Sequence, residues 1–111
     1  MTKIGVIFLN EGVWDGKPII SEQWVEKSAT SYRGNHEIKV PGSDSGRRGY
    51  AYSWWTIQYP KSDMFFAGGW GGQDIMVFPD LNAVVVFTGG AYASSVRTFT
   101  FLEKYIIPAF D

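Results

Sequence analysis

The sequence predicts an α+β domain, with helices first, an antiparallel sheet of three to four strands next, and a final helix packed on that sheet. Helix-forming patterns lie near both ends of the chain, while short apolar and aromatic runs separated by glycine- or proline-containing turns fill the second half. The chain has 111 residues, of which 45% are hydrophobic and 17% aromatic, which is enough for one buried core. We therefore expect a single domain over residues 1–111.

The first segment, residues 4–9, is apolar on every side. It fits either a buried strand or the end of a buried helix, because periodicity does not separate the two at this length. A tight turn is expected soon after it, through Asp15 and Gly16. Ser21 is a good N-cap, with Glu22 in the first turn of a short helix that should run to about Ser31.

A polar, glycine-dense stretch follows over residues 33–49, and it reads as a surface loop. It contains the only histidine, His36, which we interpret as an ordinary solvated side chain because no orienting partner is evident.

The sheet is expected between residues 50 and 87. Aromatic residues alternate over 50–59, but their parity changes at Trp54 and Trp55, which predicts a bulge or twist within one strand. Residues 64–67 and 74–78 are the next strands, and residues 79–82 form a hairpin turn. Residues 83–87 are apolar on both parities, which is typical of a central strand covered on both faces.

The chain should end in a helix capped by Ser94 or Ser95 and stopped by Pro108. Its apolar face would contain the residues that recur at helical spacing, namely Val96, Phe99, Leu102 and Ile106.

Composition excludes several function classes. The 10 basic and 11 acidic residues nearly balance, so the basic footprint of a nucleic-acid-binding protein is missing. No apolar run approaches the roughly 20 residues of a membrane-spanning helix, so we expect no membrane span. Without cysteine there is no disulfide or thiol chemistry, and one histidine is a poor basis for a metal site. No acidic residue lies in a sequence context that indicates a catalytic carboxylate. We expect no cofactor.

A glycine cluster, Ala67-Gly-Gly-Trp-Gly-Gly-Gln73, separates two of the expected strands. Glycines there allow positive φ or the close approach of another group to the backbone. The cluster lacks the Lys-Ser/Thr ending of a phosphate-binding loop, and no helix follows it. A plain hairpin with a bulge is the structural alternative.

Several motifs resemble the C-terminal third of the serine β-lactamase-like family, and they occur in the same order. The resemblance includes Gly49-Tyr-Ala-Tyr-Ser-Trp-Trp55, Phe66-Ala-Gly-Gly-Trp-Gly-Gly-Gln73, Ile75-Met-Val-Phe-Pro79 and Val84-Val-Val-Phe-Thr88. The opening, with Gly12-Val-Trp-Asp-Gly-Lys17 and Ile20-Ser-Glu-Gln-Trp-Val25, is also similar. The family includes class C β-lactamases, penicillin-binding carboxypeptidases, esterases and 6-aminohexanoate-dimer hydrolases, the last being the most similar branch. It implies a partial β-lactamase/transpeptidase-like fold in which residues 4–9 are helical.

The resemblance implies an acyl-transfer serine hydrolase. Its nucleophile belongs to a Ser-x-x-Lys motif assisted by a Tyr from a second motif, and this chain contains neither Ser-x-x-Lys nor Tyr-x-Asn. Only the region of the third motif, Lys-Thr-Gly, is present, and the corresponding residues 69–73 have no basic side chain. That departure argues against recognition of a β-lactam carboxylate and favours an ester or amide substrate.

The resemblance also implies roles for individual residues. The backbone N–H of Trp70 would be one donor of the oxyanion hole, with Gly69, Gly71 and Gly72 leaving room for the substrate. Gln73, also counted among the substrate-binding residues, would fix the turn or the strand edge by hydrogen bonds.

Two further aromatic residues, Tyr52 and Trp55, would line the acyl pocket. From the residues alone, a place in the core of the sheet is the favoured interpretation of these two, and Trp70 fits a core or rim aromatic.

Alone, such a chain should be inactive and should leave an open face or strand edge. That face would be covered by the nucleophile-bearing segment or by a second copy. A non-catalytic module that binds a sugar or peptide is the alternative function, and a structural domain without a ligand is a third.

Overall fold

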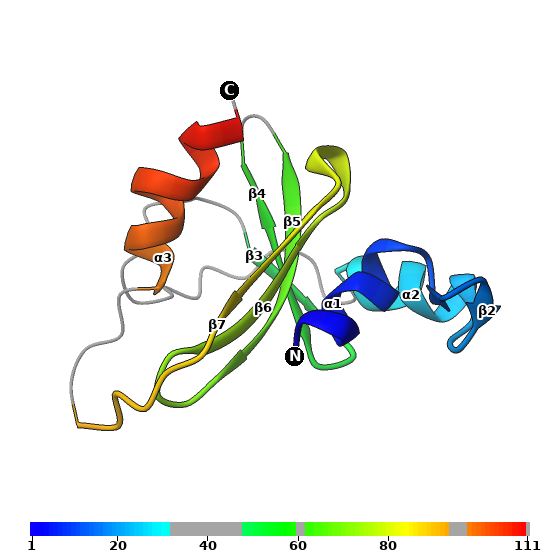
Figure 1. Cartoon of the computed structure of the whole chain (residues 1–111), viewed down its shortest axis with the longest axis horizontal. Helices are drawn as coiled ribbons and strands as arrows, with labels where there is room; N and C mark the ends of the chain where they lie inside the picture. Colours follow the sequence, from blue (N-terminus) through cyan, green and yellow to red (C-terminus); the bar gives the residue numbers. More distant parts are fainter. Residues whose placement is uncertain (32–47, 60–61, 94–97, 111) are drawn as a thin grey trace.

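The computed structural model describes residues 1–31, 48–59, 62–93 and 98–110. Its centre is a five-stranded antiparallel sheet with the strand order β3-β4-β5-β6-β7. Helices α1 and α2 lie on one face of this sheet, and a C-terminal helix lies on the other (Figure 1). The chain thus combines helices with an antiparallel sheet as predicted, although the sheet has five strands instead of three to four.

The chain begins with helix α1, Thr2–Leu9, so the ambiguous apolar segment is helical. Strands β1 (Val13–Trp14) and β2 (Lys17–Pro18) form a two-stranded hairpin. Asp15 and Gly16 connect them with φ of 50° and 71°, which confirms the predicted tight turn.

Helix α2, Glu22–Ala29, begins as predicted at the N-cap Ser21. The Ser21 Oγ accepts a hydrogen bond of 3.2 Å from the backbone N–H of Trp24. The helix ends at Ala29, two residues earlier than expected, because Thr30 has extended backbone angles.

Residues 50–59 are not one bulged strand, so that prediction is wrong. They belong to a hairpin between β3 (Arg48–Ala51) and β4 (Trp54–Gln58), in which Ala51 pairs with Trp54. Tyr52 and Ser53 form its turn with φ of 41° and 73°. The aromatic parity changes because the chain reverses direction. Two residues assigned to the surface loop, 48 and 49, belong to β3, and residues 32–47, with His36, lie outside the described residues.

The next strands are β5 (Asp63–Gly69) and β6 (Gln73–Phe78), followed by a 3₁₀ turn, Pro79–Leu81, and β7 (Ala83–Phe87). Within the described sheet β7 is an edge strand and not a central one. Its side chains still alternate between the two hydrophobic clusters of the protein, so the expectation of cover on both faces is correct. Apolar residues at both odd and even positions of a strand indicate that both of its faces are covered. An edge strand also meets this condition when helices cover both faces of the sheet.

The C-terminal helix comprises three consecutive segments, namely α3 (Thr98–Phe101), a wider π-type segment (Leu102–Ile106) and a 3₁₀ segment (Ile107–Phe110). Phe99 and Leu102 are buried against the sheet, as their spacing predicted. Pro108 was expected to end the helix, but it lies within the final 3₁₀ segment, which continues to Phe110. The predicted cap, Ser94 or Ser95, and Val96 lie outside the described residues.

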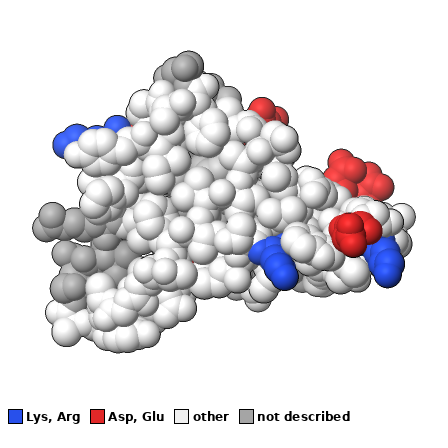
Figure 2. Space-filling model, viewed as in Figure 1, with Lys and Arg blue, Asp and Glu red and all other residues white. Residues whose placement is uncertain are grey.

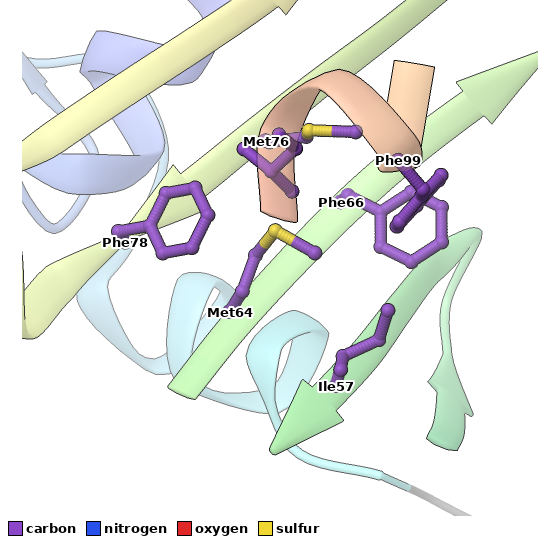
Figure 3. Close-up of a cluster of buried hydrophobic side chains, with 7 residues drawn as sticks. Ile57, Met64, Phe66, Met76, Phe78 and Phe99 are labelled. Atoms are coloured by element: carbon purple, nitrogen blue, oxygen red, sulfur yellow. The ribbon is translucent and has the colours of Figure 1, made fainter. Parts of the chain in front are cut away.

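Two hydrophobic clusters cover the two faces of the sheet. The first, which we call the C-terminal cluster, contains Ile57, Met64, Phe66, Met76, Phe78, Phe99 and Leu102 (Figure 3). The second, the N-terminal cluster, contains Phe8, Val25, Trp54, Phe65, Ile75 and Val77. Adjacent residues of β5 and β6 enter opposite clusters, which is the period-two alternation of a buried sheet. In the described part of the chain no helix has the length and apolar character needed to cross a membrane.

Candidate functional site

The glycine cluster forms the turn between β5 and β6. Gly69 pairs with Gln73, so Trp70, Gly71 and Gly72 make up the reversal, which we call the glycine turn. Gly71 and Gly72 have φ of 87° and 86°, a region that favours glycine. The Trp70 side chain is 78% exposed, so this residue lies on the rim and not in the core.

A segment that follows β7 holds the glycine turn from the side. The backbone N–H of Ala91 donates to the Gly71 carbonyl at 3.0 Å. The Gln73 Nε2 donates to the Gly89 carbonyl at 3.3 Å and to the Tyr92 hydroxyl at 3.4 Å. These bonds link the turn to residues that are remote in sequence and restrict its conformation.

The ring of Tyr92 also presses directly on Gly71. A Cβ added at Gly71 would lie 2.7 Å from the Tyr92 Cε1 atom, closer than real Cβ contacts allow. Position 71 therefore requires glycine for two reasons, the positive φ and the close approach of this ring.

The backbone N–H of Trp70 is a candidate hydrogen-bond donor for a ligand. Within the described residues it donates no hydrogen bond to another backbone group, whereas the neighbouring Gly71 carbonyl is paired. Gly68 and Gly69, which precede Trp70, are exposed and carry no side chain, whereas Gly71 and Gly72, which follow it, are buried, Gly71 against the ring of Tyr92.

Tyr52 and Trp55 do not come together at one pocket. Tyr52 is exposed in the β3–β4 turn, and its ring lies 4.9 Å from that of Trp24 on α2. Trp55 packs on the opposite face, stacked 6.5 Å from Phe66 at the C-terminal cluster. The position of Trp55 agrees with its alternative reading as an aromatic residue of the sheet core.

Asp74 is an acidic residue whose environment the sequence analysis missed. It directly follows Gln73, is only 5% exposed, and lies against Gly68, where an added Cβ would be 3.1 Å from the Asp74 Oδ1. Burial raises the pKa of the Asp74 carboxyl above 3.8, while a hydrogen bond from the Thr98 side chain acts in the opposite direction. Asp74 thus connects the strand after the glycine turn to the start of the C-terminal helix.

A signal for this burial was present in the sequence. Asp74 has the same parity as Met76 and Phe78, so it had to face the same buried side of the sheet.

A cavity of about 500 Å³ lies elsewhere on the molecule. Its lining comes from the end of α2, from β4 and β5, and from the turn before β7: Ala29, Thr30, Ser31, Thr56, Ile57, Gln58, Asp63, Met64, Phe65, Pro79 and Asp80. It includes the first residue of β5, whereas the glycine turn follows the last, and at 3.3 Å per residue these two ends are about 20 Å apart. The cavity is therefore separate from the glycine turn.

Metal ligands do not gather in the structure: no group of three or more His, Cys, Asp or Glu side chains suited to a metal occurs among the residues described. Comparison with protein-family models gives no match, and a search of curated proteins gives none either.

Proposed function

We propose that this chain is the C-terminal segment of a β-lactamase-related serine hydrolase that transfers the acyl group of an ester or amide. The observation that carries the proposal is the glycine turn, in which the Trp70 N–H donates to no other backbone group of the described residues and which Gln73 and Tyr92 brace. The ordered set of sequence motifs supports the same conclusion. The nucleophilic Ser and its Lys come from another segment, so this chain alone is inactive. That segment, or a second copy of the chain, covers the open face.

The turn would act by stabilising charge. When a serine attacks an acyl carbonyl, negative charge develops on the carbonyl oxygen, and a donor already in place stabilises it without a reorganisation cost. The Trp70 N–H would be one such donor, and the second would come from the nucleophile's own segment. Loss of one donor of this kind typically costs about 10²–10³ in rate.

The two strands that the glycine turn joins carry no cation between Asp63 and Asp80, which favours a neutral substrate. Between Asp63 and Asp80 the only charged side chain is that of Asp74, which is buried and directed toward the C-terminal helix. No cation is therefore available in this stretch to pair with a substrate carboxylate. Beside the donor lies the exposed indole of Trp70, an apolar surface suited to the acyl or alcohol part of an ester or amide.

The test uses the chain extended upstream in its gene until the Ser-x-x-Lys motif is included. The variant Trp70→Pro removes the backbone N–H, and Trp70→Ala keeps that N–H while removing the indole. Labelling by a fluorophosphonate should slow by about 10²–10³ in Trp70→Pro and change only a few-fold in Trp70→Ala. Equal rates in the two variants would refute the donor role, and an upstream gene without Ser-x-x-Lys would refute the hydrolase proposal.

A binding module for a sugar or peptide is the second candidate. It is favoured by two exposed aromatic residues next to Gly71: Trp70 precedes it in the chain, and the ring of Tyr92 contacts it. Titration of the chain with oligosaccharides and peptides should then quench tryptophan fluorescence saturably, and Trp70→Phe should abolish that quenching. No saturable change with any of them would remove this candidate.

A further inference from the structure

The cavity at the end of α2 has the size and lining of a binding site, and it lies apart from the glycine turn. Its volume of about 500 Å³ falls within the roughly 300–1,000 Å³ of typical small-molecule sites. Phe65, which lines it, belongs to the N-terminal cluster and pairs with Thr56. Gln58 and Asp63 pair with each other two residues further along, so they project to the same face of the sheet. The cavity therefore lies on the face that α2 covers.

One end of this cavity is acidic. Asp63 and Asp80 both line it, and the Asp80 Oδ2 accepts a hydrogen bond of 3.4 Å from the backbone N–H of Asp63, so the two residues lie side by side. Among the described residues, neither carboxylate forms an ion pair with Lys, Arg or His. Figure 2 shows acidic atoms at the place that the turn before β7 has in Figure 1, and the basic atoms on this face lie away from it. Two carboxylates without a cation favour a positively charged ligand.

The end of α2 adds to the negative potential of the cavity. The helix ends at Ala29, and both this residue and Thr30 line the cavity. Carbonyl groups in the last turn of a helix carry partial negative charge, which favours a nearby cation. The last turn also contains Lys27, but the adjacent Glu26 balances its charge, and neither residue lines the cavity. Lysine and arginine are thus missing from the described lining.

The acceptors match the three N–H donors of a primary ammonium group. Gln58 lies opposite Asp63 across the two strands, so its amide oxygen is a third acceptor beside the two carboxylates. A bare metal ion fits less well, because the described residues contain no group of three His, Cys, Asp or Glu suited to one. The lining also includes Phe65 and Pro79, which offer apolar surface to a carbon chain.

We propose that this cavity binds a primary alkylamine. Asp63, Asp80 and Gln58 accept hydrogen bonds from its ammonium group, and the alkyl chain lies along Phe65 toward the end of α2. The site is independent of the hydrolase proposal, because binding here needs neither the glycine turn nor a nucleophile.

Calorimetric titration of the chain with butylamine at low salt tests the proposal. Butylamine should bind saturably, whereas 1-butanol, which has a hydroxyl in place of the ammonium, should bind about tenfold more weakly. Butanoate has the wrong charge and should not bind. The backbone amides of Asp63 and Asp80 should show the largest chemical-shift changes with butylamine. Absence of saturable binding, equal affinity for 1-butanol, or shifts centred on the glycine turn would overturn the proposal.

Substitutions assign the binding to the two carboxylates. Asp63→Asn and Asp80→Asn keep the side-chain shape at exposed positions, and each should weaken butylamine binding about two- to fivefold. The double variant should bind it no better than 1-butanol. The matched control is Asp15→Asn, at an exposed aspartate in the β1–β2 turn that does not line the cavity, and it should leave the affinity unchanged. A double variant with undiminished affinity, or an equal loss in Asp15→Asn, would overturn the proposal.

An alkylammonium group occurs both in free amines and in the side chain of lysine. A parallel titration with Nα-acetyl-lysine N-methylamide, a lysine blocked at both ends, separates the two sources. Saturable binding of either compound at the two aspartates supports the proposal, and the tighter of the two identifies the source. Failure of both to bind would overturn it.

Discussion

Replacement of Gly71 by alanine tests whether the glycine turn has the backbone and contacts described above. Two costs arise at this position. The residue has φ of 87°, where an L side chain is strained, and its new Cβ would lie 2.7 Å from the ring of Tyr92. A matched control exists at Gly16, which has φ of 71° but nothing within 4 Å of the added Cβ. The pair of substitutions therefore separates backbone strain from the ring contact.

The magnitudes follow from these two terms. Backbone strain at positive φ costs about 1–3 kcal/mol, partly offset by the lower entropy that alanine gives the unfolded chain, so Gly16→Ala should cost about 1 kcal/mol. The clash with Tyr92 is an overpacking term of about 1–3 kcal/mol, which brings Gly71→Ala to about 3 kcal/mol. A domain of this size has roughly 5–15 kcal/mol of stability, so both variants should remain folded.

Urea denaturation followed by circular dichroism measures both variants on one scale. The single variant Tyr92→Ala and the double variant Gly71→Ala/Tyr92→Ala complete the cycle. Without the ring, Gly71→Ala should lose most of the cost of the clash and keep the cost of the backbone strain. A free-energy difference between Gly71→Ala and Gly16→Ala below about 0.5 kcal/mol would refute the proposed contact with Tyr92.

Three further changes have defined outcomes. Because burial raises the pKa of the Asp74 carboxyl in the folded state, folding favours its protonated form, and the free energy of unfolding should fall as pH rises above 3.8 through the folded pKa. Asp74→Asn should flatten this pH dependence in urea titrations at several pH values. A pH dependence that the variant leaves unchanged would contradict the burial of Asp74. Trp70→Ala should change the free energy of unfolding by less than about 0.5 kcal/mol, whereas Trp54→Ala, at a buried site, should cost about 3–5 kcal/mol. Ser21→Ala should cost about 1 kcal/mol, since the Trp24 N–H loses its acceptor, and Ser21→Asp should restore most of that stability.

Local features of the chain were predictable where one residue type fixes a conformation. The Asp15–Gly16 turn and the Ser21 cap follow from backbone chemistry that acts over two or three residues. The β3–β4 hairpin was missed because Tyr52 and Ser53 rarely adopt positive φ, and sequence reasoning expects glycine or asparagine there. Here the pairing of the strands and the contact of Tyr52 with Trp24 overcome the local preference.

Longer-range features were less predictable. The apolar pattern of residues 83–87 correctly predicted that both faces of this strand are covered. When helices cover both faces of a sheet, however, the pattern within a strand does not distinguish an edge strand from a central strand. At the candidate site, the glycines and Gln73 stood out in the sequence, whereas Tyr92 did not. Its contact with Gly71 joins residues 21 apart, and only the fold brings them together.

Intact mass after fluorophosphonate treatment tests most directly the proposal that this chain supplies an oxyanion donor but not the nucleophile. The 111-residue chain should remain folded and gain no adduct, while the same chain extended upstream through Ser-x-x-Lys should gain one adduct per molecule. A stoichiometric adduct on the 111-residue chain would contradict the proposal, because one of its own serines would then be the activated nucleophile. A folded extended protein without any adduct would contradict it equally.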